Sequence, residues 1–248
     1  MNSDHQMITK LLSRIVLAVA LNTGSLMQIK AANAQSEVLL EEDFSGSTIP
    51  RGWVGNRKAF SIVAGTLRGV AAPGDSHGPA LILPITGHDL TVEFDVKFAK
   101  PGYFLFLIDG DSQFRGQAHL LRFSIGGTQY QLAQDRGDPA SKLAQKKERD
   151  RRGGKRIPAT KEQLADPSFY RIDRLAFGKT KAAVDEWRHV RIELRGNKVK
   201  ARLGDDGGLT AIGTVLDVKK SKIVFLVAQT ADVRIDNLKV VALENRGR

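Results

Sequence analysis

The residues that could carry chemistry in this sequence gather around one short segment. Asp109 and Asp111 flank Gly110, and His119 follows eight residues later. A histidine beside a carboxylate can act as a general base, because its pKa normally lies near neutrality. The two aspartates could also bind calcium, which takes oxygen ligands, although such sites use more oxygens than this segment supplies. An ordinary turn with a surface histidine is the simpler interpretation, so Asp109, Asp111 and His119 are candidates only if the protein is an enzyme.

A second group of polar residues is expected on neighbouring strands and could bind sugar. Their side chains offer the mixed donors and acceptors that sugar hydroxyls need. An ordinary hydrated sheet face is the alternative. The carbohydrate-binding candidates are Arg122, Gln129, Gln131 and Gln134. Trp53 and Trp187 could stack on sugar rings, but both precede predicted strands, which favours packing in the core.

A basic segment supplies a third kind of contact. Residues 142–156 hold eight Lys or Arg against two acids. Such a charge run could bind sulfated or uronic polysaccharide, or it could be only a solvated loop. It lacks the interleaved aromatic residues on which single-stranded nucleic acid stacks, so no nucleic-acid partner is predicted. The candidate contacts with an anionic polymer are Lys146, Lys147, Arg149, Arg151, Arg152, Lys155 and Arg156.

Several other chemistries find no support in the sequence. The chain has no cysteine, which excludes disulfides, thiolate metal sites and a cysteine nucleophile. The histidines show no metal-ligand spacing, so no metal site and no cofactor are predicted. There is no Gly-x-Ser-x-Gly motif, no phosphate-binding loop and no Rossmann pattern. The formal net charge of +11 favours anionic partners or simply solubility.

The elements that must position these residues are strands, and the clearest lie within residues 186–203. Val190, Ile192 and Leu194 alternate with charged residues, so they share one face of a strand. Gly196 and Asn197 form a two-residue turn, which pairs Leu194 with Val199. The pattern predicts an antiparallel hairpin with one buried face and one basic face. A shift of one residue would bury lysines, so the register is firmly set.

Similar patterns recur along residues 35–248 and predict a single all-β domain of about twelve short strands. Residues 103–108 and 222–230 are apolar on both faces, which is typical of central strands. A break in alternation predicts a bulge at Asp236 and Asn237. Frequent glycine turns favour a two-sheet antiparallel jelly-roll sandwich. Residues 135–183 interrupt this rhythm and predict a basic insertion, partly helical or disordered, with its charge run mobile.

The N-terminus has the plan of a secretory signal peptide. Lys10 and Arg14 precede the apolar residues 15–21, and a small-x-small site ends at Ala34. Residues 1–34 are therefore a predicted signal peptide, with translation starting at Met1 or Met7. The apolar run is too short for a stable membrane span. We expect an exported protein, periplasmic or extracellular.

The order of several segments resembles the concanavalin A-like lectin/glucanase superfamily, and within it the bacterial 3-keto-disaccharide hydrolase-type and laminin-G-like domains. The matching segments are 43–46, 52–53, 60–67, 90–97, 186–187 and 233–238. The resemblance implies two curved antiparallel sheets, often with sugar bound on the concave one. Related glucanases carry Glu-x-Asp-x-x-Glu on one strand. Here Glu93 and Asp95 are followed by Phe98 where the second Glu would stand, so that two-Glu chemistry is not expected.

The sequence thus leaves three functions open. The first is an exported carbohydrate-binding domain without two-Glu glycosidase chemistry. The second is a glycoside hydrolase-type enzyme acting on a modified, 3-keto disaccharide, which His119 within ~4 Å of Asp109 or Asp111 would favour. The third is a surface structural or protein-interaction module, which a flat, closed concave face would favour.

Overall fold

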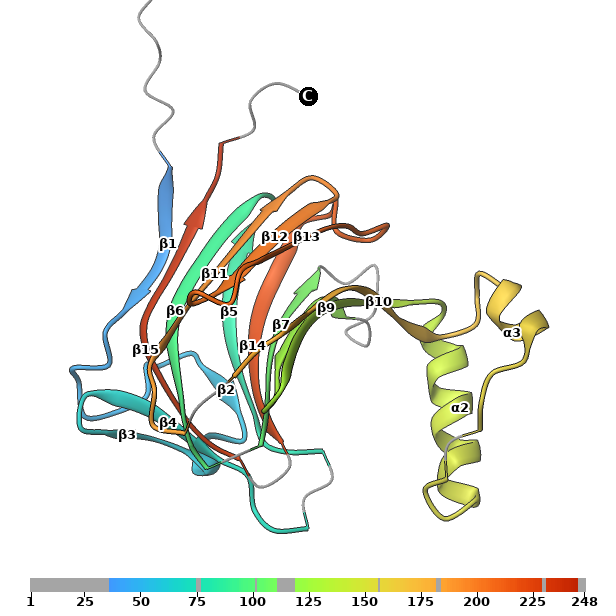
Figure 1. The fold of residues 1–248 in the computed structure, drawn as a ribbon, viewed down its shortest axis with the longest axis horizontal. Coiled ribbons are helices and arrows are strands. Elements are labelled where there is room, and N and C mark those ends of the chain that lie inside the picture. Colours follow the sequence, from blue (N-terminus) through green and yellow to red (C-terminus); the bar gives the residue numbers. More distant parts are fainter. Residues whose placement is uncertain are drawn as a thin grey trace, which may run out of the picture. The chain divides into compact units, whose positions relative to one another are not determined.

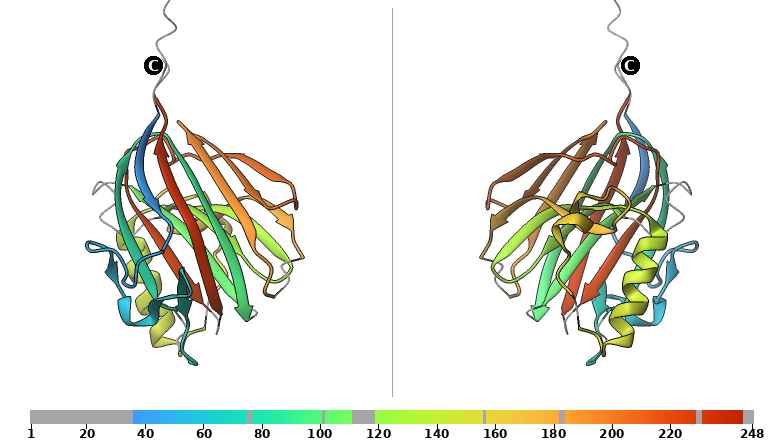
Figure 2. Two further views of the ribbon diagram at one scale, coloured as in Figure 1. Left: turned by 90° about the vertical axis from the view of Figure 1, so that its left-hand side faces the viewer. Right: turned by 90° about the vertical axis from the view of Figure 1, so that its right-hand side faces the viewer.

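The computed structural model of this chain describes residues 36–244, except 75–76, 101, 111–118, 156, 182–183 and 229–230. The predicted signal peptide, Asp111 and Arg156 lie outside the described residues. Over the described part, antiparallel strands form two sheets that lie face to face (Figures 1 and 2). No helix in this part is long and apolar enough to cross a membrane.

The first sheet has eight strands among the described residues. From one edge to the other they are β13 (Gly208–Ile212), β12 (Lys198–Leu203), β11 (Arg188–Arg195), β6 (Leu90–Lys100), β15 (Asp232–Ala242), β4 (Thr66–Val70) and β3 (Phe60–Val63), with β1 (Glu37–Glu42) also paired to β15. The neighbouring strands pair antiparallel.

The second sheet has seven strands in the part of the chain that is described. In order they are β10 (Arg171–Lys179), β9 (Gln129–Arg136), β8 (His119–Ile125), β7 (Tyr103–Gly110), β14 (Lys220–Ala228), β5 (Ala80–Gly87) and β2 (Val54–Gly55). Strands β7 and β14 lie in its middle, as the doubly apolar sequence predicts. The face of this sheet that is turned away from the eight-stranded sheet is called the outer face below.

The predicted hairpin is confirmed as β11 and β12. Leu194 pairs with Val199 and Ile192 with Ala201 across the turn, in the predicted register. The apolar members are buried, and Gly196 takes a positive φ of 53° that a glycine adopts without strain. The hairpin therefore buries one face and leaves its charged face outside.

The core lies between the sheets and is rich in phenylalanine. Phe94 of the first sheet contacts Phe104, Phe106 and Phe225 of the second, with ring centroids 5.3 to 6.1 Å apart. Trp53 is buried in this core, as expected, with its ring edge-on to Phe44. These aromatic contacts join the inner faces of the two sheets.

Two local expectations have different outcomes. The bulge in β15 is confirmed, because the pairing with β6 shifts between Asp236 and Lys239, and Asn237 has a positive φ of 51°. The expectation that Trp187 packs in the core is wrong. This residue is 41% exposed, and the Lys97 ammonium lies 5.1 Å from the ring centre. The segment before β11 places the ring outside the sandwich.

The insertion is partly helical, which confirms one of the two predicted forms. Helix α2 (Pro139–Arg151) begins after Asp138, whose carboxylate accepts a hydrogen bond from the Ala140 amide. A short helix, α3 (Lys161–Ala165), and a 3-10 turn, η1 (Arg57–Ala59), are the other helical segments described. The basic run is thus helical as far as Arg151. The chain then returns as β10, an edge strand that the sequence analysis did not predict.

Candidate functional site

The outer face of the seven-stranded sheet gathers most of the candidate side chains. Leu107 pairs with Arg122, and Leu105 with Ser124, so alternate residues of β7 and β8 share this face. Ser124 in turn pairs with Gln131. Helix α2 lies on the same side of the molecule as this face, beyond the ends of β9 and β10 (Figures 1 and 2).

One end of the outer face holds a line of aromatic and polar side chains, which we call the aromatic row: Tyr103, Ser124, Gln131 and Phe177. The Tyr103 hydroxyl donates to Ser124 Oγ at 2.8 Å and accepts from Gln131 Nε2 at 3.3 Å. Phe177 pairs with Gln131 and is 60% exposed. The Arg174 guanidinium lies 5.7 Å from the Phe177 ring centre. The row therefore offers an exposed ring beside fixed polar groups.

The other end of the outer face brings together His119, Asp109 and Lys222. His119 Nδ1 lies 2.6 Å from Asp109 Oδ1, and Lys222 Nζ lies 3.4 Å from Asp109 Oδ2. A register shift between Ile108 and Asp109 sets His119 opposite the carboxylate. In the tautomer that donates from Nδ1 to Asp109, Nε2 is the nitrogen left for a ligand. This geometry suits a general base.

Next to this pair, Asp135 is the centre of a buried polar cluster. Its carboxylate, with a fully buried side chain, accepts from Arg122 Nε at 2.5 Å and Nη2 at 3.0 Å, and from the Tyr170 hydroxyl at 2.9 Å. The His119 amide donates to the same carboxylate, and Lys142 Nζ lies 3.5 Å from it. The cluster ties β8 and β9 to helix α2 and to the segment that leads into β10.

The pKa values in this cluster follow from burial and pairing. Burial alone would raise the pKa of Asp135, but the hydrogen bonds from Arg122 outweigh it and hold that pKa below its usual value. Burial lowers the pKa of Lys142, against the opposing charge of Asp135. Burial raises the pKa of Tyr170, and the neighbouring Asp135 charge raises it further. Asp135 is therefore a charged, saturated group, unsuited to act as a second catalytic acid.

The predicted sugar contacts divide between the two faces of the sheet. Gln129 and Gln131 share the outer face, and Gln129 is exposed. Arg122 is on the same face but its guanidinium is occupied by Asp135. Gln134 faces the interior, where its amide donates to Thr214 Oγ1 at 3.1 Å and accepts from the Thr214 amide at 2.9 Å. Gln134 is thus closed to a ligand.

The basic candidates lie on and just after helix α2. Lys146, Lys147 and Lys155 are exposed. Arg151 and Arg152 are exposed as well, and both donate to Glu148. These hydrogen bonds lower the pKa of Glu148 to about 2. Arg149 is half-buried on the opposite side of the helix from Lys147, with Nε 3.7 Å from Asp150.

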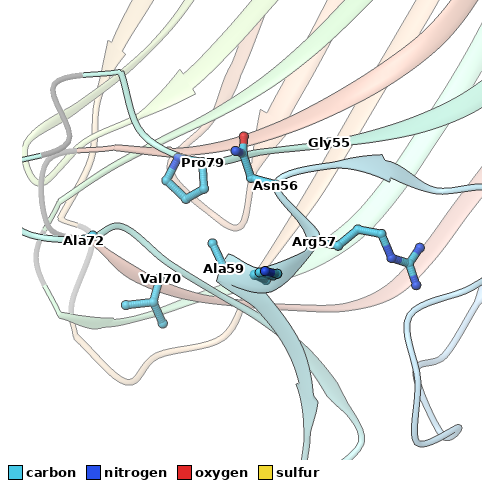
Figure 3. A pocket seen from close by; sticks show the side chains of 8 residues that line it. Gly55, Asn56, Arg57, Ala59, Val70, Ala72 and Pro79 are labelled. Carbon is cyan, nitrogen blue, oxygen red and sulfur yellow. The ribbon is translucent and has the colours of Figure 1, made fainter.

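Among the described residues, neither a metal site nor the surface hollow beside η1 adds a second candidate catalytic centre. In the described ranges, no group of three His, Asp or Glu could hold a metal ion. Asp109, considered above for calcium, instead contacts two basic side chains. A surface hollow of about 500 Å³ lies beside η1, lined by Asn56, Lys58, Val70 and neighbouring residues (Figure 3). In the part of the chain that is described, no acid or histidine lines it, and the Arg57 guanidinium turns away to bond backbone carbonyls.

Several residues of this face were not among the predicted site residues. Period-2 counting along β7 places Tyr103 on the same face as Leu105, Leu107 and Asp109, so its position on this face could have been predicted from the sequence. Asp135 and Tyr170 belong to segments that had been assigned to the insertion. Phe177 sits in β10, which was not predicted.

Comparison with known proteins identifies the fold. No protein-family model and no curated protein matches the chain in sequence. A carbohydrate-binding module, CBM66 from Bacillus subtilis, is 13% identical with a TM-score of 0.50, over 78% of this chain and 95% of the module. The laminarinase from Rhodothermus marinus is 10% identical with a TM-score of 0.53, over 85% of this chain and 99% of the enzyme. LamA from Zobellia galactanivorans, in complex with laminaritriose and laminaritetraose, is 11% identical with a TM-score of 0.53, over 83% and 98% of the two chains.

The chain thus has the fold of the concanavalin A-like lectin/glucanase superfamily, as the sequence resemblance implied. Carbohydrate-binding modules and glycoside hydrolases share this fold. At such identities the likeness shows the fold alone, and activity has to be argued from the site.

Proposed function

We propose that this protein binds carbohydrate on the outer face of its seven-stranded sheet. The observation that carries the proposal is the aromatic row, where the exposed Phe177 ring stands beside the linked polar groups of Tyr103, Ser124 and Gln131. A sugar presents an apolar ring face and a rim of hydroxyls. An exposed aromatic ring can stack on the first, and the fixed donors and acceptors can bind the second. Similar folds that bind sugar, such as the B. subtilis module and LamA, support the proposal.

The first experiment is a glycan array, followed by titration calorimetry with each glycan that binds. Laminaritriose is included as a neutral probe. Phe177→Ala should weaken binding about 5- to 30-fold, because truncating an aromatic anchor costs about 1–2 kcal/mol. The matched control is Ile212→Ala, which truncates a 68% exposed apolar residue on the other sheet. Equal affinities of the Phe177 variant and the parent for every glycan that binds would refute the proposed site.

A second function, hydrolysis of a modified disaccharide, is favoured by one observation. His119 and Asp109 converge at 2.6 Å on the same face as the aromatic row. We propose His119 as the general base of this alternative, with Asp109 as the group that orients it. The two-Glu route is not part of it, because Phe98 stands in place of the second Glu and Asp135 is saturated.

The enzyme alternative is tested with a 3-keto disaccharide and an assay for released monosaccharide. His119→Gln should abolish turnover and leave glycan affinity within about threefold. His189→Gln is a matched control, because His189 forms a similar pair with Asp95 at 2.9 Å on the other sheet. Absence of turnover by the parent protein would leave carbohydrate binding alone as the function, whereas equal turnover by the His119 variant would refute His119 as the general base.

We also propose that the protein is exported. The support is the order of basic residues, apolar run and small-x-small site within residues 1–34. Export would bring the outer face into contact with polysaccharides outside the cytoplasm.

A further inference from the structure

We propose that the ligand of the outer face is an acidic polysaccharide, and that helix α2 forms the second wall of its binding site. This inference rests on the proposed function and narrows it to a substrate class. Its support comes from the polarity of the helix, the way in which the helix is attached, and the balance of charge on this side of the molecule.

The inner side of helix α2 is polar. Its half-buried residues recur at the spacing of one helical face. They are Ser141, Lys142, Gln145, Glu148 and Arg149. None of the residues of α2 is buried. A helix that packs permanently against a protein core buries an apolar stripe. This helix has none, so its inner side is suited to water or to a hydroxyl-rich, charged ligand.

The helix is attached to the sandwich only near its beginning, as far as the described contacts go. The Tyr170 amide donates to Ser141 Oγ at 3.0 Å, and Gln145 Nε2 donates to the Tyr170 carbonyl at 2.9 Å. Lys142 adds its ion pair with Asp135. Beyond Gln145, the described hydrogen bonds and ion pairs of the helix side chains stay within the segment itself. The basic second half therefore projects from a fixed base.

The charge on this side is strongly unbalanced. Residues 139–155 contain seven Lys or Arg and two acids, an excess of five positive charges. Glu148 is shared by two arginines, while Lys146, Lys147 and Lys155 have no carboxylate within 4.0 Å among the described residues. The sheet contributes exposed Arg174 and Lys179 beside the aromatic row.

The acids of the outer face do not offset this excess. Asp109 is paired with His119 and Lys222, and Asp135 with Arg122 and Lys142. A surface of one sign raises the local concentration of a polymer of the opposite sign. Carboxylate or sulfate groups repeated along a sugar chain can meet the helix cations while a sugar ring stacks on Phe177. The helix carries no aromatic residue, so successive nucleic-acid bases would find no stacking partners along it once one ring has stacked on Phe177. This favours a polysaccharide over nucleic acid.

The test compares two double variants that remove equal charge. Lys146→Gln/Lys147→Gln removes it from helix α2, and Lys198→Gln/Lys200→Gln removes it from exposed positions on strand β12 of the other sheet. Affinities are measured for polygalacturonic acid, dextran sulfate, neutral laminarin and single-stranded oligo(dT), at about 20 mM and 500 mM NaCl. At low salt the helix variant should bind an acidic glycan about 3- to 10-fold more weakly, as expected for two exposed charge contacts. The strand variant should change less than twofold.

High salt should shrink the helix effect, because the Debye length falls below about 10 Å. Glu148→Gln should tighten binding at low salt, since it frees Arg151 and Arg152. Polygalacturonic acid and dextran sulfate separate carboxylate from sulfate recognition, and preference for either supports the inference.

Four outcomes would overturn the inference. Equal losses in the two double variants would mean nonspecific attraction to a basic protein. Oligo(dT) bound as tightly as the acidic glycans would mean a general polyanion surface. If laminarin binds as tightly as the acidic glycans, the acidic substrate class is refuted and carbohydrate binding remains. If no glycan binds, the acidic substrate class and the proposed carbohydrate binding are both refuted.

Discussion

Replacing Arg122 with methionine should destabilise the protein rather than simply remove a ligand contact. The side chain of Asp135 is 0% exposed, and Arg122 provides two of its hydrogen bonds. Breaking a buried pair by removing one partner costs about 3–5 kcal/mol, because the remaining charge is left uncompensated. Tyr170, Lys142 and the His119 amide still contact the carboxylate, so the lower end, about 3 kcal/mol, is expected.

That loss corresponds to a fall in Tm of about 6–12 °C, at roughly 2–4 °C per kcal/mol for a chain of this size. Arg122→Met/Asp135→Leu should recover most of it, because the buried charge is then absent. Arg174→Met is the control on the same face, where the arginine is exposed and its loss should shift Tm by less than about 2 °C.

The loss of stability in Arg122→Met should depend on pH in a defined direction. The folded protein holds the pKa of Asp135 below its usual value near 3.9, so this carboxylate stabilises the fold above about pH 4. That contribution disappears as the pH falls through the folded pKa. Without Arg122, burial raises the pKa of Asp135, so the variant can accept a proton at a pH where the parent remains charged. The difference in unfolding free energy should therefore be largest at neutral pH and shrink on acidification.

Urea denaturation at pH 7 and pH 4, with thermal scans as a second probe, measures both effects. A result that would sink this account is an unchanged Tm together with lost glycan affinity in Arg122→Met. Arg122 would then be a ligand contact, as its sequence position first indicated, and its link to Asp135 would have little energetic weight. A stability loss independent of pH would also contradict the assignment of a buried charge.

Three further predictions follow from other parts of the fold. Ile192→Asp should lower the free energy of unfolding by about 4 kcal/mol, because it buries an unpaired charge between the sheets. Glu193→Lys, on the solvent-facing side of the same strand, should lower it by less than about 1 kcal/mol. Equal shifts in urea midpoint for the two variants would contradict the pairing register. Mass spectrometry of the exported protein should find an N-terminus at Gln35, and an intact Met1 on the mature protein would contradict signal cleavage. Deleting residues 138–166 should lower Tm by only a few degrees, because no buried residue of α2 or α3 is lost. The two ends of the segment also lie close together, as the 2.8 Å between the Asp138 amide and the Ser168 carbonyl shows, so a short connection can close the gap. A collapse of the fold would show that the helices support the core.

Sequence periodicity was sufficient wherever burial alternates strictly along a strand. The hairpin of β11 and β12 could be paired residue by residue, because any shift would place lysines such as Lys200 in the core. Helix α2 carries a readable start, with Asp138 as its cap and Pro139 in the first turn. The helix lacks an apolar stripe, however, so periodicity could not separate an ordered helix from a mobile arm.

Strand β10 was missed for a different reason. Its pairing with β9 shifts between Arg174 and Ala176, so the apolar residues do not keep one parity along the strand. It also follows a highly charged segment and lies at the edge of the sheet, with little buried surface. Without β10, Phe177 could not be assigned to the outer face.

The interpretation of β9 could have been sharper from the sequence alone. Once Gln131 is placed on the outer face, period-2 counting places Asp135 there and Gln134 on the interior face. The partners of Asp135 could not be deduced in this way. Arg122, Tyr170 and Lys142 come from separate segments, and only the tertiary fold brings them to one carboxylate.

The two ends of the outer face differ in how far their side chains are already occupied by partners within the protein, and this determines where a ligand can bind. At the Asp135 end, charged groups satisfy one another, so a ligand gains little by replacing those contacts. At the Phe177 end, an aromatic ring is exposed beside polar groups that are already oriented. Binding energy should therefore come mainly from the aromatic row and from the helix cations. If the protein also catalyses a reaction, the sugar must extend from that row along the sheet to reach His119, whose contact with Asp109 leaves Nε2 for the reacting group.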